Sequence, residues 1–179
     1  MKTALVFLCF SVCAFAQQKI NNGQSADQLR LPAACGPANV SFKVSLDQGQ
    51  HGPAPIEAGK AVIYFIHDVG IPSAARGWGY PTTRYALDGS WVGAAHGGSW
   101  FELPVEPGEH HICATLQTAL VDQRVELAHL TAEAGKTYYF RTRLVLSGQV
   151  ELLELNQTDS DEGEYAVSEY PMATAHARK

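Results

Sequence analysis

The sequence predicts an all-β fold, an antiparallel β-sandwich of about seven or eight strands with one short C-terminal helix. Three observations predict it. Short apolar runs recur along the chain, turn signals separate them at spacings of about 8 to 12 residues, and a single acidic, helix-like segment lies near the end. The chain has 179 residues, which is close to the size of one domain with a sizeable core.

The first 16 residues have the pattern of a secretory signal peptide. A positive start at Lys2 precedes the apolar run "ALVFLCFSVCAFA", and small residues at Ala14 and Ala16 predict cleavage after Ala16. The run is shorter than the roughly 20 residues that cross a bilayer, and no later segment reaches that length, so no transmembrane segment is predicted. Lipid attachment at Cys13 is not expected, because "FSV" before it lacks a small residue. A periplasmic or extracellular location follows.

Charge argues against nucleic acid as a partner. The whole chain carries a net charge of -5, and loss of Lys2 with the signal leaves 12 basic and 18 acidic residues, a balance of 12 minus 18, or -6. Binders of nucleic acid or anionic lipid concentrate Lys and Arg instead. No motif indicates a cofactor.

Cysteine usage predicts one disulfide. Cys9 and Cys13 leave with the signal, so the exported chain keeps only Cys35 and Cys113. In an oxidising compartment this pair is expected to form a bridge. It would close a loop of 113 minus 35, or 78, residues and stabilise the fold by about 4 kcal/mol in the chain-entropy model. It would also pin the end of residues 17–37, which are polar, aperiodic and predicted to be a flexible arm.

Strands are predicted from residue 39 onward. "NVSFKVSL", residues 39–46, alternates apolar and polar side chains, as expected of a half-buried strand. "KAVIYFIHD", residues 60–68, is apolar on both sides and predicts a central strand covered on both faces. Further strands flank turn signals at Asp88-Gly89, at Pro107-Gly108 and at residues 134–136. "QVELLEL" adds another.

The end of the chain has a different pattern. "DSDEGEYAVSEY" begins with capping candidates and acidic residues and stops before Pro171, so it predicts a short helix. Residues 172–179 are predicted to be a disordered tail. The sandwich domain is therefore expected to span residues 38–171.

Three segments together resemble a bacterial envelope family, domain of unknown function 2846: "LDGSWVGAAHGGSWFELPVEPGEHHICA", "AGKTYYFRTRL" and "DSDEGEYAVSEYP". The resemblance covers roughly residues 59–171 and is carried by turns and core strands. It implies a β-sandwich in exported, often lipid-anchored proteins, and no catalytic residues to carry over.

The stretch "EPGEHHICATL" is the segment richest in potential metal ligands and nucleophiles, because His110, His111 and Cys113 lie close together in it. Neighbours on a strand point to opposite faces, so the two histidines are not expected to share one metal ion, and no other histidine lies at a recognisable ligand spacing. A cysteine nucleophile would need a free thiolate beside a base, whereas the predicted disulfide consumes Cys113. No metal site and no catalytic residue are predicted.

Aromatic residues are the remaining candidates for ligand binding. They are Trp78, Tyr80, Trp91 and Trp100. If exposed, such side chains stack on sugars or anchor a protein partner; the alternative is that they pack against the sandwich. Arg141 and Arg143 are expected to form ion pairs with acidic residues of a neighbouring strand.

The sequence therefore favours an exported, non-catalytic binding or interaction domain of the bacterial cell envelope, with an unknown envelope protein or glycan as partner. Two alternatives stay open: a carbohydrate-binding module that uses the aromatic residues, and a hydrolase with an unrecognised site. The oligomeric state is not determined by the sequence.

Overall fold

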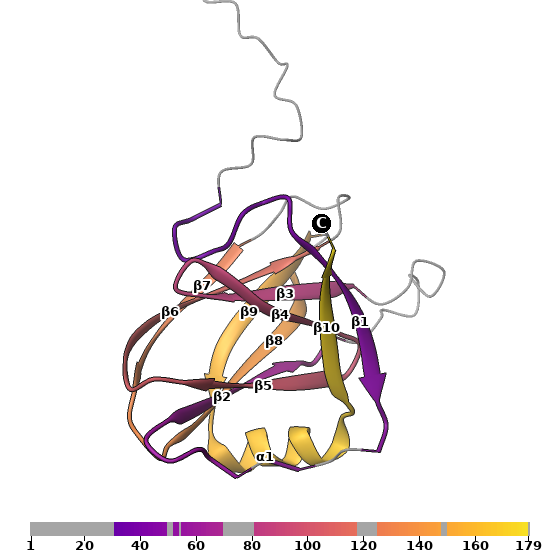
Figure 1. The fold of residues 1–179 in the computed structure, drawn as a ribbon. Helices are drawn as coiled ribbons and strands as arrows, with labels where there is room; N and C mark the ends of the chain where they lie inside the picture. Colours follow the sequence, from indigo (N-terminus) through magenta and orange to yellow (C-terminus); the bar gives the residue numbers. More distant parts are fainter. Residues whose placement is uncertain are drawn as a thin grey trace, which may run out of the picture.

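The computed structural model describes residues 31–49, 52–53, 55–69, 81–117, 125–147 and 150–178 (Figure 1). The predicted signal peptide and its cleavage site, residues 17–30 of the predicted arm, Trp78 and Tyr80 lie outside the described residues.

The described chain contains ten strands and one helix, which confirms an all-β, sandwich-like fold with one short helix near the C-terminus. The prediction of a purely antiparallel sandwich of about seven or eight strands is wrong in two respects, because the described chain has ten strands and two pairs of strands run parallel. Six strands form a mixed sheet in the order β1-β10-β5-β2-β8-β9, and four form an antiparallel sheet in the order β4-β3-β6-β7. The elements are β1 (Ser41–Asp47), β2 (Ala61–His67), β3 (Thr82–Leu87), β4 (Ser90–His96), β5 (Ser99–Val105), β6 (Gly108–Leu116), β7 (Val125–Ala132), β8 (Thr137–Ser147), β9 (Val150–Thr158), α1 (Ser160–Glu169) and β10 (Met172–Arg178).

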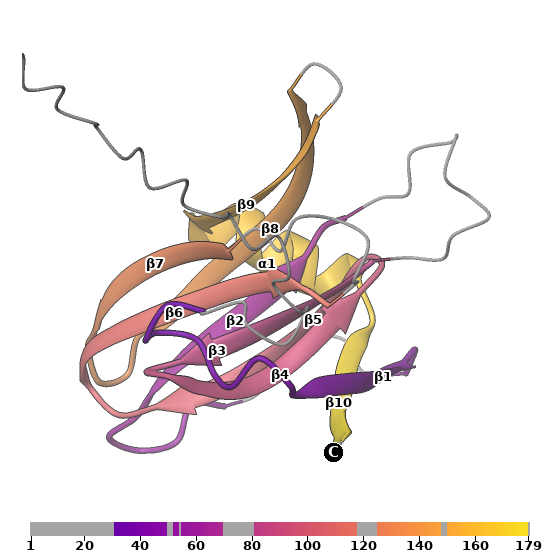
Figure 2. The same cartoon turned by 90° about the horizontal axis from the view of Figure 1, so that it is seen from above.

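Strand β2 is the centre of the molecule, as its continuous apolar sequence predicts. All seven of its residues are buried. Ile63 and Phe65 point into the core between the two sheets, whereas Tyr64 and Ile66 point to the opposite face, where they pack under Ala166 and Val167 of α1. The four-stranded sheet and α1 therefore cover opposite faces of the six-stranded sheet (Figure 2).

The hairpin between β3 and β4 turns where the Asp-Gly signal predicts. Asp88 has φ 50° and Gly89 has φ 81°, so both central residues adopt the left-handed conformation that Asp and Gly tolerate best. Glu106 and Pro107 likewise separate β5 from β6, which begins at Gly108. Local turn chemistry thus sets the order of the strands.

The predicted disordered tail, residues 172–179, is wrong for residues 172–178. They form β10, which pairs antiparallel with β1 along seven residues. Its alanines explain the pairing: Ala173, Ala175 and Ala177 recur every second residue and lie opposite Leu46, Val44 and Phe42. The domain therefore extends to Arg178 and does not end at residue 171.

The bridge between Cys35 and Cys113 is present, with their Cα atoms 5.2 Å apart, which confirms the predicted disulfide. Residues 31–37 are packed against the outer face of the four-stranded sheet, so the prediction of a flexible arm is wrong for this part. The backbone N–H of Gly89 donates to the carbonyl of Ala34 at 3.1 Å, and Cys35 is buried. The bridge holds this segment in place, and a disulfide is compatible with a non-cytoplasmic location.

Candidate functional site

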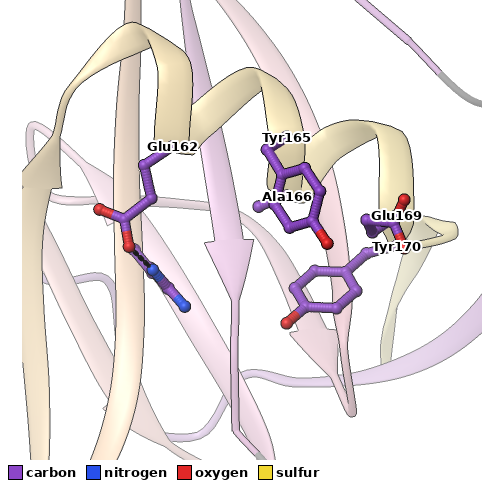
Figure 3. Close-up of a pocket in the computed structure, with 6 residues that line it drawn as sticks. Glu162, Tyr165, Ala166, Glu169 and Tyr170 are labelled. Atoms are coloured by element: carbon purple, nitrogen blue, oxygen red, sulfur yellow. Dashed lines mark hydrogen bonds and ion pairs between the residues drawn. The ribbon is translucent and has the colours of Figure 1, made fainter.

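A pocket of about 280 Å³ lies between α1 and the outer face of the six-stranded sheet. Figure 3 shows Glu162 and Tyr170 extending toward the sheet from opposite ends of the helix. The lining residues are Arg141, Glu162, Tyr165, Ala166, Glu169 and Tyr170. All but Arg141 come from α1 or the residue that follows it, so the position of the helix creates the pocket.

The helix begins where its capping sequence predicts. The side chain of Asp159 accepts a hydrogen bond from the backbone N–H of Glu162 at 2.8 Å, which satisfies one of the free donors of the first turn. Gly163 packs directly on the ring of Tyr139, where a Cβ atom would lie 2.2 Å from Cγ. Only glycine permits this close approach, and the approach brings Glu162 over β8.

Two arginines of β8 are held by carboxylates from two other elements. Arg141 Nε donates to Asp68 Oδ2 at 3.0 Å and its guanidinium also pairs with Glu162. Arg143 Nη2 donates to the same Glu162 at 3.1 Å. Asp68 directly follows β2, the strand next to β8, in agreement with the expected ion pairs; Glu162 comes from the helix and was not expected.

Tyr170, which lines the pocket, forms a hydrogen-bonded pair with Asp68. The hydroxyl of Tyr170 donates to Asp68 Oδ1 at 2.7 Å. Partial burial raises the pKa of Asp68, but the Tyr170 hydroxyl and Arg141 outweigh burial and hold the pKa below its usual value. Burial, reinforced by Asp68, raises the pKa of Tyr170 to about 12. Near pH 7 the carboxylate is therefore charged and the phenol neutral.

Trp100 is not a surface residue, so its proposed role in ligand binding is wrong. Its side chain is 0% exposed, its indole N–H donates to the carbonyl of Tyr170 at 2.8 Å, and its ring packs against Tyr64. Alternation along β5 does place it on the face opposite Phe101. The sequence pattern could not show that α1 covers this face.

Trp91 is half-buried in a separate place, on the outer face of the four-stranded sheet. Its indole N–H donates to the carbonyl of Pro37 at 2.7 Å, and the guanidinium of Arg84 lies 4.4 Å from the ring centroid. The side chain is thus used to hold the segment that precedes β1. The structure does not bring Trp91 and Trp100 into one groove.

His110 and His111, near the start of β6, point to opposite faces of the sheet, as predicted. The side chain of His110 is 12% exposed and its Nδ1 lies 2.7 Å from Asp88 Oδ2, whereas the side chain of His111 is 64% exposed. Cys113 is buried in the disulfide. Over the part of the chain that the structure describes, no three His, Cys, Asp or Glu side chains are arranged to hold a metal ion.

Comparison of the chain with protein-family models, with curated proteins and with solved structures finds no match. No helix in the described ranges is long and apolar enough to cross a membrane.

Proposed function

We propose that this protein is an exported, non-catalytic binding domain of the bacterial cell envelope, and that α1 presents its interaction surface to an envelope protein. The N-terminal sequence pattern and the Cys35–Cys113 bridge support export. The quoted resemblance to family 2846 supports an envelope role, and its motifs fall at the Asp88-Gly89 turn, at the Pro107-Gly108 turn and in α1.

The observation that carries the proposal is the exposure of Tyr165 beside the pocket. Its side chain projects from α1 and the residue is 67% exposed, although it is large and partly apolar. Tyrosine is enriched among the residues that dominate binding energy at protein interfaces, because it buries a large area at low entropic cost and keeps a polar group. Acidic residues of α1 flank it, namely Asp161, Glu164 and Glu169. A partner with a basic surface matches this charge.

Charge pairing inside the pocket also favours binding over catalysis. Arg141 and Arg143 neutralise Asp68 and Glu162, and none of the described lining residues is a histidine, cysteine or serine. A preformed, internally paired surface loses little entropy when a partner docks.

The test is capture of a partner from an envelope extract with the exported chain immobilised. Tyr165→Ala is the test variant. Leu127→Ala is the matched control, because Leu127 is the other large hydrophobic residue exposed in the described chain, at 53%, and lies on β7 away from α1. A protein captured by the unmodified chain and by Leu127→Ala but lost with Tyr165→Ala supports the proposal.

Three results would contradict it. Capture that is unaffected by Tyr165→Ala would place the interface elsewhere. Binding to a glycan array would favour the carbohydrate-binding alternative. Turnover of ester or glycoside substrates that survives purification to homogeneity would favour the hydrolase.

A further inference from the structure

His129 lies directly opposite His111 on the outer face of the four-stranded sheet. The two residues are register partners in the antiparallel pair of β6 and β7. Their side chains are 64% and 53% exposed for His111 and His129, and their ring centroids are 5.1 Å apart. The two histidines are 129 minus 111, or 18, residues apart in the sequence, so their spacing does not reveal the pairing.

The hydrogen bonds of His111 show which kind of cross-strand pair this is. Its backbone N–H donates to Asp88 Oδ1 at 2.8 Å, and its carbonyl accepts from the backbone N–H of Asp88 at 2.9 Å. Both groups therefore point away from β7, so His111 and His129 form a pair without mutual backbone hydrogen bonds. Such pairs have the shorter Cα separation, about 4.5 Å, and the closer side chains. Two imidazoles at this separation can reach one ion, with metal–nitrogen distances of about 2.0–2.1 Å.

A carboxylate stands beside one ring nitrogen of each histidine. Glu109 Oε2 lies 2.5 Å from Nε2 of His129, and Asp88 Oδ1 lies 4.0 Å from Nδ1 of His111. Metal-binding histidines typically donate their second N–H to a carboxylate, which fixes the tautomer and leaves the other nitrogen to coordinate. Glu109 therefore leaves Nδ1 of His129 to coordinate, whereas Asp88, at 4.0 Å, makes no hydrogen bond to the ring of His111 and leaves both of its nitrogens open to the ion.

Glu109 is itself held in position. The hydroxyl of Thr131 donates to Glu109 Oε1 at 2.6 Å, from the residue opposite Glu109 in the register. The carboxylate is thus held where its other oxygen meets the imidazole of His129.

We propose that His111 and His129 form a surface site for one divalent transition-metal ion that favours imidazole, with Zn²⁺ as the reference ion. Glu109 orients the ring of His129, and water completes the coordination, since the described chain places no third protein ligand. The site lies on the outer face of the four-stranded sheet, away from α1, and does not depend on the proposed protein interface.

The experiment is calorimetric titration of the exported, disulfide-bonded chain with Zn²⁺ alone at pH 7.5. The unmodified chain is expected to bind one equivalent. His111→Asn and His129→Asn should each weaken binding at least about tenfold, and Glu109→Gln should weaken it by about tenfold through loss of orientation. His176→Asn is the matched control, because His176 is also exposed on a strand but faces Lys43 rather than a histidine; it should leave binding unchanged.

A second measurement identifies the coordinating atoms. Imidazole ¹⁵N spectra should show Zn²⁺-dependent shifts at Nδ1 of His129 and at one ring nitrogen of His111. Absence of Zn²⁺ binding by the folded chain, or undiminished binding by the His111→Asn, His129→Asn double variant, would overturn the proposal; unchanged melting of the metal-free variants verifies that they fold.

Discussion

Asp88 Oδ2 lies 2.7 Å from Nδ1 of His110. This contact joins the turn between β3 and β4 to the start of β6. The same ring contacts the carbonyl of Glu106 through Nε2 at 2.8 Å. Partial burial lowers the pKa of His110, but these two contacts outweigh it and raise the pKa overall. Burial raises the pKa of Asp88, and its contacts with His111 and His110 outweigh that effect and lower it.

Because of these two pKa shifts, the Asp88–His110 pair stabilises the fold mainly at acidic pH. A histidine whose pKa is raised in the folded chain stabilises the fold at pH values below its ordinary pKa of 6.5. It loses that effect as the pH rises through the folded pKa. An aspartate with a lowered pKa stabilises above 3.8 and loses the effect as the pH falls. The pair should therefore contribute most between about pH 4 and pH 6.5.

Asp88→Asn tests this window, because Asn tolerates the left-handed conformation of the turn, keeps one oxygen that can accept from the backbone N–H of His111, and removes the charge that faces His110. The free energy of unfolding should drop by about 0.5 to 1 kcal/mol more at pH 5.5 than at pH 8.5, a surface-pair magnitude. Urea denaturation at the two pH values measures it, with Asp161→Asn on the exposed side of α1 as control. An equal loss at both pH values would show that His110 is not charged in the folded chain.

Gly163→Ala is expected to destabilise the fold, although alanine is the better helix former. The new methyl group would meet the ring of Tyr139, which is fixed between α1 and Tyr64. Overpacking of this kind costs about 1–3 kcal/mol, more than the roughly 1 kcal/mol that helix propensity returns. Thermal or urea unfolding should show a net loss for Gly163→Ala and little change for Ser168→Ala, an exposed position of the same helix. A stabilised Gly163→Ala would mean that the helix does not sit on Tyr139.

Local patterns predicted most of the fold because they act through near neighbours in the sequence. The apolar run of β2, the Asp88-Gly89 turn and the Asp159 cap each carry their own signal. Strand β10 was missed since alanine has a weak strand preference, even though Ala173, Ala175 and Ala177 alternate.

The candidate pocket could not be predicted in the same way. Its contacts join distant parts of the chain: Asp68 and Tyr170 are 102 residues apart, and Asp68 and Arg141 are 73 apart. No short-range pattern encodes where α1 docks, and that docking decides both the burial of Trp100 and the exposure of Tyr165. The register of β6 with β7, which brings His111 and His129 together, is likewise a property of the sheet.

Removal of either cysteine should cost the same stability. Cys35→Ala and Cys113→Ala are each expected to lower the free energy of unfolding by about 2–5 kcal/mol, because the bridge closes a loop of 78 residues in the unfolded chain. The free energy of unfolding of the double variant should not fall below that of the less stable single variant, because the same one bond is lost in all three variants. Denaturant unfolding without reductant measures this. Strictly additive losses would indicate that each side chain stabilises independently of the bond.

His67 should make the fold sensitive to acid. The ring is 0% exposed at the end of β2, and its Nδ1 lies 2.8 Å from the carbonyl of Gly97. Burial is the main cause that lowers its pKa to about 4, with His96 adding to the effect and Gly97 and Asp68 opposing it. Because the folded pKa lies below the ordinary 6.5, the contribution is complete above pH 6.5 and is lost as the pH falls toward 4.

The expected loss between pH 7 and pH 4 is about 2 to 3 kcal/mol from this residue, at 1.36 kcal/mol per unit of pKa. His67→Gln retains an amide N–H that can donate to Gly97, so the variant should be less stable at pH 7 yet show a flatter dependence on pH. Urea unfolding at pH 7, 5.5 and 4.5 measures how steeply the free energy of unfolding falls as the pH is lowered. His96→Gln is the control, because His96 is a half-buried histidine close to His67 in space. If His67→Gln keeps the full slope of the unmodified chain, the acid sensitivity arises from other groups and His67 is not buried in its neutral form.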